Sequence, residues 1–303
     1  MPENPSAAIR RPIVVGVDGS PESRAALEWA AREAVLWSRP LHLTHVFLWP
    51  VTGVPSLSPI DTGQWQSAGA LLTEALQHVN ALFPELDVRT SVSLGRAAAS
   101  LVRMGHEAAM IVVGHRGHGG FAGLHLGSIA VQVSAHAPCP VAVVRSAEVE
   151  ASGRVVVGVD VVGGSETALK FAFEEAAARG CGLAAVHAWT VPAGAGEDLP
   201  PVYDVDAVNS DEERVLAEVL ATWQQKYPAV DVHHVVRHGL PPEVLIDAAA
   251  GAELLVVGSR GHGGFVGLLL GSVSQAVLHH ASCPVVVVRR SASAVSWKGE
   301  SPA

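Results

Sequence analysis

The sequence GHRGHGGFAGLHLGS, at Gly114–Ser128, occurs a second time in this chain as GSRGHGGFVGLLLGS, at Gly258–Ser272. Both copies have the spacing G-x2-G-x9-G-S. Each copy follows a short apolar run, Met110–Val113 or Leu254–Val257, and precedes a segment that is predicted to be a helix. A glycine-rich loop that joins a buried strand to a helix is typical of α/β proteins, and this chain contains two of them.

The glycine loops also predict a chemistry. Backbone amides in such a loop can face an anion, and the N-terminus of the following helix adds a favourable dipole. Glycines also serve tight turns, so a single copy would not separate a phosphate site from a turn. Two copies with the same spacing favour the phosphate site, although both descend from one ancestral sequence and are not independent.

The repetition extends beyond the glycine loops. PIVVGVDGS at Pro12–Ser20 matches VVVGVDVV at Val155–Val162, and PCPVAVVR at Pro138–Arg145 matches SCPVVVVR at Ser282–Arg289. The repeated unit is much longer than the repeats of solenoid proteins, so we interpret it as a whole domain. A chain of 303 residues is long enough for two ordinary domains. The predicted organisation is two tandem domains at 1–148 and 149–292, followed by a flexible tail at 293–303.

Each half alternates apolar strands with helical segments, which predicts a parallel sheet covered by helices on both faces. We expect a helix that ends near Trp37, with Ser20 as its N-cap and Pro21 at its first position. In the second half we expect the helix that contains Val215 to begin at a capping box, Ser210–Glu213. The strands expected in the first half are Ile13–Asp18, Leu41–Trp49, Val88–Leu94, Ile111–Gly114 and Val141–Arg145.

The composition excludes several classes of function. A net charge of −9 argues against general binding of nucleic acid. No apolar stretch approaches the length that a bilayer requires, so we expect no membrane span. The first residues lack the apolar core of a secretory signal, which predicts a cytoplasmic protein. The 3 cysteines make no disulfide framework, and we interpret Cys139 and Cys283 as small apolar strand residues.

At this point the residues resemble a known family. VGVD at the first strand, His45-Val46 and His187-Ala188 near the end of the second strands, and the two glycine loops are similar to the universal stress protein family. The resemblance extends from about Arg11 to Arg290 and is closest to its tandem-domain type. It implies a five-stranded sheet of order 3-2-1-4-5 in each half, and it implies the branch of the family that binds ATP.

The resemblance also implies roles for individual residues. Gly16 and Asp18 correspond to positions that border the ribose and the phosphate–metal region, and Val46 to the position whose backbone meets adenine. Asp18 and Asp160 are candidate ligands of Mg²⁺ through bound ATP. The candidate loop contacts of the first half are Gly114, Arg116, Gly117, Gly120, Gly127, Ser128 and Ile129. The candidate contacts of the second half are Gly158, Asp160, Ala188, Gly258, Arg260, Gly261, Gly264, Gly271, Ser272 and Val273.

Simpler roles compete with these assignments. Each aspartate could instead cap its turn or the next helix. Arg116 and Arg260 could pair with a phosphate or with a surface carboxylate. We interpret His45 and His187 as hydrogen-bonded core residues rather than ligands, because they lie within apolar strands.

The two halves differ directly after the aspartate. Asp18 is followed by Gly19, whereas Asp160 is followed by Val161 and Val162. β-Branched residues rarely adopt a positive φ, so the second turn must differ if Gly19 needs that conformation. We therefore do not treat the two sites as equivalent.

The sequence contains no P-loop lysine pattern and no evident catalytic constellation. This favours a regulator that senses ATP and acts on an unidentified regulatory protein partner. The alternatives are a slow ATPase or nucleotide phosphotransferase, and a scaffold with vestigial sites. The valine-rich fifth strands, Val141–Arg145 and Val285–Arg289, are predicted sheet edges, so we expect edge pairing that gives a homodimer or joins the two halves.

Overall fold

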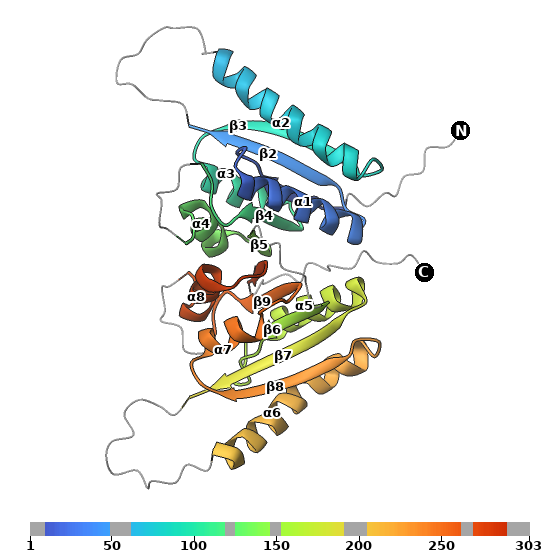
Figure 1. Cartoon of the computed structure of the whole chain (residues 1–303), viewed down its shortest axis with the longest axis vertical. Coiled ribbons are helices and arrows are strands. Elements are labelled where there is room, and N and C mark those ends of the chain that lie inside the picture. Colours follow the sequence, from blue (N-terminus) through green and yellow to red (C-terminus); the bar gives the residue numbers. More distant parts are fainter. Residues whose placement is uncertain are drawn as a thin grey trace, which may run out of the picture. The chain divides into compact units, whose positions relative to one another are not determined.

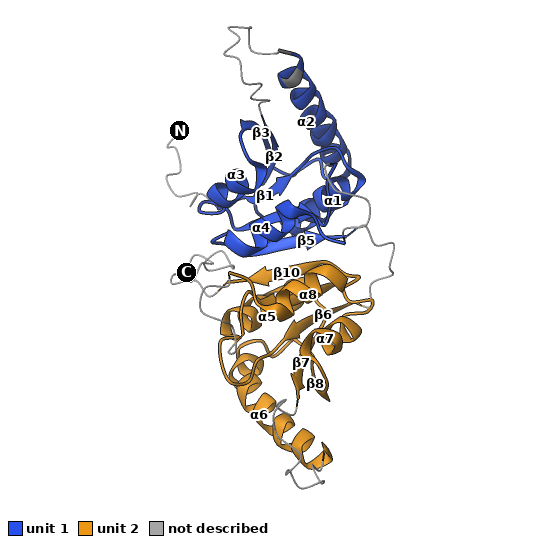
Figure 2. Cartoon of the chain, turned by 90° about the vertical axis from the view of Figure 1, so that its left-hand side faces the viewer, with its two compact units in different colours: residues 1–146, 293–303 blue, residues 147–292 orange. Residues whose placement is uncertain are grey.

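The computed structural model describes residues 10–48, 62–118, 125–145, 153–190, 205–261 and 269–289. Contacts divide the chain into two compact units (Figure 2), and the described residues up to 145 belong to the first and those from 153 to the second. The predicted domain boundary at 148–149, the boundary at 292 and the tail at 293–303 lie outside the described residues.

The first unit is a five-stranded parallel sheet of order β3-β2-β1-β4-β5, as predicted. Its strands are β1 (Ile13–Gly16), β2 (Leu41–Phe47), β3 (Val88–Leu94), β4 (Met110–Gly114) and β5 (Val141–Val144). Its helices are α1 (Pro21–Leu36), α2 (Thr62–Leu82), α3 (Ala97–Met104) and α4 (Ser128–His136).

The second unit repeats this architecture with the order β8-β7-β6-β9-β10. Its strands are β6 (Arg154–Gly158), β7 (Gly182–Trp189), β8 (Val232–His238), β9 (Leu254–Gly258) and β10 (Val285–Val288). Its helices are α5 (Glu166–Arg179), α6 (Val205–Lys226), α7 (Pro241–Ala248) and α8 (Ser272–His280). Both units therefore have the doubly wound α/β fold.

Helices cover both faces of each sheet (Figure 1). In the first unit α1 and α2 pack together on one face, while α3 and α4 pack together on the other. In the second unit the corresponding pairs are α5 with α6 and α7 with α8. Because both faces are covered, the central strands consist almost entirely of buried aliphatic residues, and Ile13, Val15, Val155 and Val157 have no exposed surface.

The predicted start of α6 was wrong. The helix begins at Val205 rather than at Ser210, and Asp206 occupies its first turn, where an acidic side chain stabilises the helix dipole. Ser210 lies inside the helix, where its Oγ donates a hydrogen bond to the carbonyl oxygen of Asp206 at 2.9 Å instead of capping an N-terminus. β1 and β2 also end earlier than predicted, at Gly16 and Phe47, and Trp49 lies outside the described residues.

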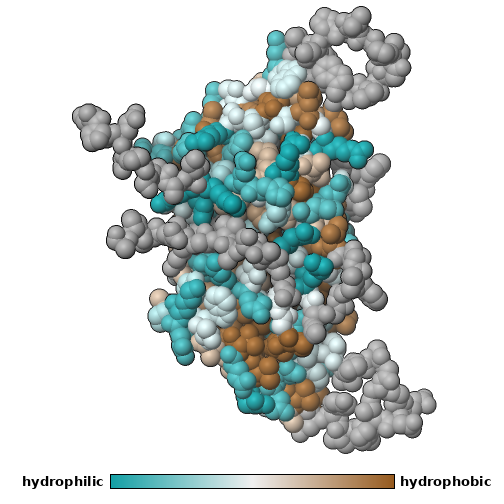
Figure 3. Space-filling view, turned by 180° about the vertical axis from the view of Figure 1, so that it is seen from behind, coloured by the Kyte–Doolittle hydropathy of each residue, from teal (hydrophilic) through white to brown (hydrophobic). Residues whose placement is uncertain are grey.

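The cysteines form no disulfide in the described structure, and Cys139 and Cys283 are buried. Burial raises the pKa of Cys139 to about 12, which leaves this thiol protonated and unreactive at neutral pH. Within the part of the chain that the structure describes, no helix is long and apolar enough to cross a membrane. On the face that Figure 3 displays, hydrophilic residues cover much of the surface, and hydrophobic residues gather in a patch on the second unit.

Candidate functional site

The carboxyl ends of β1 and β4 lie side by side in the middle of the first sheet. The two strands pair directly, with Ile13 opposite Met110 and Val15 opposite Val112. From β1 the chain continues through α1 to β2 on one side, and from β4 it continues to β5 on the other. This is a topological switch point, where doubly wound sheets bind their ligands, and Asp18 and the first glycine loop follow these two strands.

The turn after β1 has the geometry that its residues predict. Gly19 has a φ of +84°, a conformation that glycine adopts without strain. Ser20 is the N-cap of α1, and its Oγ accepts a hydrogen bond from the Ser23 amide at 3.1 Å. Asp18 Oδ1 accepts hydrogen bonds from the amide of Ser20 at 2.9 Å and from its hydroxyl at 2.6 Å. Asp18 therefore performs the turn-capping role.

Asp18 also contacts the glycine loop. Its Oδ2 accepts a hydrogen bond from the amide of His118 at 3.0 Å. Gly117 packs so closely against this carboxylate that a Cβ at its position would overlap Oδ2. The same side chain therefore joins the turn after β1 to the loop after β4, which the spacing of these residues in the sequence does not reveal.

Four donors determine the ionisation of Asp18. Burial alone would raise its pKa, but hydrogen bonds from the hydroxyl and amide of Ser20, from the amide of His118 and from Ser23 outweigh burial and hold the pKa below its ordinary 3.8. The group is therefore a carboxylate at neutral pH, and it is available as a negatively charged ligand.

This ionisation predicts how stability depends on pH. Because the folded pKa is lower than the unfolded one, Asp18 should stabilise the fold above the unfolded pKa of about 3.8 and lose this contribution as pH falls through the folded pKa. In urea unfolding, Asp18→Asn should be less stable than wild type near neutral pH, and the difference should shrink in acid. The exposed Asp211→Asn serves as the control. A difference that stays constant with pH would contradict the assignment.

The other loop positions of the first unit also lie close to neighbouring backbone. A Cβ on Gly114 would lie 2.8 Å from the carbonyl carbon and oxygen of Glu22 in α1. Gly127 is the N-cap of α4, and its amide donates to the carbonyl oxygen of His115 at 2.7 Å. Ser128 and Ile129 are exposed in the first turn of α4, where amides have no acceptor within the helix.

The second unit places Asp160 in a similar position. Its amide donates to Ser165 Oγ at 2.8 Å, and its Oδ1 accepts from the amide of Val162 at 3.2 Å. A Cβ on Gly261 would lie 3.0 Å from Asp160 Oδ2, so the second loop also approaches the aspartate. The amide of Gly271 donates to the carbonyl oxygen of Ser259 at 2.7 Å, as that of Gly127 does to His115.

The two turns differ, as predicted from Val161. In the second unit the positive φ angles fall on Gly163, at +134°, and on Gly164, at +95°. α5 begins only at Glu166, so the chain has a glycine turn where the first unit has the first turn of α1. Among the described residues, only the carbonyl oxygen of Arg260 lies within 4 Å of a Cβ on Gly258, at 3.3 Å.

The second strands carry the predicted adenine positions. His45 Nδ1 bonds to the carbonyl oxygen of Val17 at 2.7 Å, and His187 Nδ1 to that of Val159 at 3.0 Å. His187 Nε2 also lies 3.3 Å from Glu212. Both histidines thus connect neighbouring strand ends, which supports a structural role. The adjacent Val46 and Ala188 are partly exposed at the same carboxyl end.

Some assignments receive less support. Arg116 Nε lies 3.2 Å from His115 Nε2, and Arg116 forms no ion pair with a carboxylate in the described ranges. Gly120 and Gly264 lie outside the described residues. The described residues contain no cluster of three or more potential metal-ligating side chains. A metal at Asp18 or Asp160 would therefore need ligands from a bound molecule.

The sequence interpretation missed two serines. Ser23 and Ser165 stand at the same distance along the chain from Asp18 and Asp160, and each hydroxyl accepts a hydrogen bond from the amide of its aspartate, at 3.4 Å and 2.8 Å. An alignment of the two halves could have identified them, because both halves carry a serine at this position.

Comparisons with known proteins agree with the fold and the motifs. The model of the universal stress protein family matches residues 10–145 and again 152–289. A universal stress protein of Mycobacterium tuberculosis is 40% identical over 297 residues, which cover 92% of this chain and 97% of that protein. One from Mycolicibacterium smegmatis is 39% identical over 289 residues, which cover 91% and 96%.

A solved structure shows the same fold. The crystal structure of a universal stress protein from Archaeoglobus fulgidus DSM 4304 superposes with a TM-score of 0.69 at 21% identity, covering 92% of this chain and 98% of that one. Both halves match the family model, and the mycobacterial relatives match almost the whole chain. The chain therefore belongs to the universal stress protein family.

Proposed function

We propose that each half of this universal stress protein binds ATP at the carboxyl ends of its central strands. The observation that carries the proposal is the close approach of the loop glycine to the aspartate after the central strand. In the first unit, a Cβ added to Gly117 would overlap the Asp18 carboxylate. In the second unit, a Cβ added to Gly261 would lie very close to the Asp160 carboxylate. The next helix begins directly after each loop, and the first amides of a helix have no acceptor within the helix, an arrangement that suits phosphate groups.

The residues present also fit Mg²⁺ in company with ATP. Mg²⁺ prefers oxygen ligands and commonly uses one or two carboxylates together with substrate phosphates and water. Asp18 is ionised at neutral pH, and each of its oxygens can accept more than the hydrogen bonds that it already receives. Bound Mg²⁺ would neutralise phosphate charge, while Asp18 or Asp160 would orient it.

We further propose that the protein senses ATP rather than consuming it. Transfer of a phosphoryl group requires charge stabilisation and a residue that positions the nucleophile, and the glycine loops contain no P-loop lysine. A sensor needs two conformations that bind ATP with different affinity, and the favoured conformation would contact a regulatory protein partner.

One experiment tests the binding and the sensing together. Protein purified without added nucleotide is denatured, and the released small molecules are identified by mass spectrometry. Release of intact ATP supports the proposal, while ADP or AMP alone favours the ATPase or phosphotransferase. If nothing is released and calorimetry with Mg-ATP gives no heat of binding, the sites are vestigial and the proposal fails.

The oligomeric state is a separate prediction. Among the described residues of the first unit, β5 pairs with β4 alone, and all four of its residues are aliphatic. Because strand edges favour pairing with other edges, we propose that the fifth strands pair, either between the two halves of one chain or between two chains as a homodimer. For the homodimer, light scattering at micromolar concentration should give twice the mass of the 31.4 kDa chain. A mass of one chain over the whole concentration range would exclude pairing between chains.

A further inference from the structure

A cluster of polar side chains lies on one face of β2 and β3 in the first unit. In the parallel register, His42 is opposite Arg89, and Thr44 is opposite Ser91. His42 Nε2 lies 2.8 Å from Ser91 Oγ, and the Ser91 hydroxyl also bonds to Thr44 Oγ1 at 3.2 Å. A serine hydroxyl within hydrogen-bond distance of an imidazole nitrogen is the arrangement of a nucleophile and its base.

The cluster lies on the face of the sheet that α2 does not cover. Phe47 of β2 contacts Trp65 of α2. Because alternate residues of a strand point to opposite faces, His42 and Thr44 point away from α2. On this second face α3 packs over β1 and β2, whereas the helix that β3 chiefly contacts is α2. His42 and Ser91 are partly exposed, so a small molecule in solution can reach the pair.

Within the described strands, the second unit has no counterpart of this cluster. The register of β7 and β8 places Ala184 and Val186 at the positions of His42 and Thr44, and Val235 at that of Ser91. Ala184 and Val186 are buried apolar residues, which are usual in parallel sheets that helices cover on both faces. The repeat therefore provides an internal control for any chemistry of the cluster.

His42 is suited to accept a proton. Partial burial lowers its pKa first, and the charge of Arg89 lowers it further below the ordinary 6.5. The imidazole is therefore neutral at neutral pH, and one of its ring nitrogens can accept a hydrogen bond. A neutral imidazole within hydrogen-bond distance of a hydroxyl can act as its general base.

Arg89 supplies a positive charge on the same face. It precedes Ser91 by two residues along β3, so the two side chains leave the strand on one side. Its guanidinium is exposed, and it lies 3.6 Å from the carboxylate of Asp87. Because exposed ion pairs are weak, the guanidinium can turn toward an oxygen atom that becomes negatively charged beside Ser91.

We propose that Ser91 accepts an acyl group from activated esters, with His42 as the general base. Ser91 Oγ forms a bond to the carbonyl carbon of the ester, while His42 Nε2 takes the hydroxyl proton. The bond from that carbon to the leaving oxygen then breaks, and His42 gives the proton to the departing alcohol. The products are an acylated Ser91 and an alcohol, so no further reactant is consumed.

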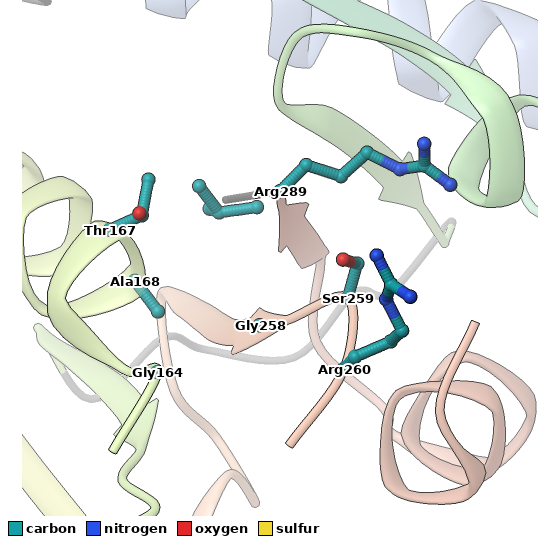
Figure 4. A pocket seen from close by; sticks show the side chains of 8 residues that line it. Gly164, Thr167, Ala168, Gly258, Ser259, Arg260 and Arg289 are labelled. Carbon is teal, nitrogen blue, oxygen red and sulfur yellow. The ribbon is translucent and has the colours of Figure 1, made fainter. Parts of the chain in front are cut away.

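This site is separate from the proposed ATP sites. In the second unit a pocket lies at the loop after β9, and Figure 4 shows Thr167 and Ala168 of α5 on one side of it and Ser259 and Arg260 on the other. The histidine–serine pair lies instead on β2 and β3. Their equivalents in the second unit, β7 and β8, contribute no described residue to the pocket. Acyl transfer therefore does not require bound ATP.

The test is acetylation of the full chain by p-nitrophenyl acetate. Mass spectrometry should find an acetyl group on the tryptic peptide Thr90–Arg96, and fragmentation should assign it to Ser91. Peptides from β7 and β8 should stay unmodified. Absence of an acetyl group from Ser91 of the wild type would overturn the proposal, whichever other residues react.

Variants test the role of His42. Ser91→Ala should abolish acetylation of the peptide, and His42→Gln should slow it at least about tenfold, because the general base is lost. Ser93→Ala is the matched control and should react as the wild type does, since Ser93 lies on the same strand face but opposite Val46 rather than a histidine. Circular dichroism checks that each variant is folded.

The dependence on pH separates a base from a structural partner. Because His42 accepts protons only while it is neutral, the wild-type rate should fall as pH drops through its lowered pKa. The slower reaction of His42→Gln should lack this step. Equal rates in the wild type and His42→Gln, or the same pH step in both, would refute the role of His42.

Discussion

Gly114→Ala is expected to lower the free energy of unfolding of the first unit by about 1–3 kcal/mol, the usual range for overpacking. The added methyl would lie 2.8 Å from the backbone of Glu22, which cannot move aside because α1 is fixed by Pro21 and by the Ser20 cap. Hydrogen exchange at the amides of β1 and β4, followed by mass spectrometry, reports the opening of this unit separately.

The repeat offers a matched control for this change. Gly258→Ala adds the same methyl at the equivalent position, where its nearest described neighbour is the carbonyl oxygen of Arg260 at 3.3 Å, and it should cost much less. Gly69→Ala lies in α2 with no neighbour within 4 Å and should stabilise the helix. Equal destabilisation by Gly114→Ala and Gly258→Ala would show that the two helix starts do not differ as described.

Gly117→Ala is expected to reduce the affinity of the first site for Mg-ATP about tenfold or more, which corresponds to roughly 1.4 kcal/mol of binding free energy. The new Cβ would overlap Asp18 Oδ2, so either the carboxylate or the loop must move away from the other. The hydrogen bond from the His118 amide to the same oxygen would be lost as well. Calorimetry with Mg-ATP measures the effect.

The second half again supplies the comparison. In Gly261→Ala the new Cβ would lie 3.0 Å from Asp160 Oδ2. This distance is shorter than most such contacts, but a small shift would relieve it. The loss of ATP affinity should therefore be smaller than in Gly117→Ala. Circular dichroism of both variants checks that the fold is retained. ATP affinity that is unchanged in folded Gly117→Ala would remove the main support for nucleotide binding at Asp18.

Much of the fold could be predicted because it depends on local patterns. The runs of valine identified the buried strands, and Ser20-Pro21-Glu22 identified the start of α1 within one residue. The start of α6 was missed because the capping pattern at Ser210 is equally compatible with a helix interior, where serine bonds to the preceding turn. In that region the upstream residues, from Val205 onward, extended the helix.

The doubled glycine loop, the aspartate after each central strand and the contrast between Gly19 and Val161 could all be found in the linear sequence. They determined the tandem doubly wound fold and the inequality of the two turns, because φ preferences and strand patterns act over a few residues. The close approach of Gly117 to Asp18, and of Gly261 to Asp160, depended on tertiary structure. These contacts arise because β1 and β4, and likewise β6 and β9, end side by side, and only the packing of distant segments fixes how closely those ends approach.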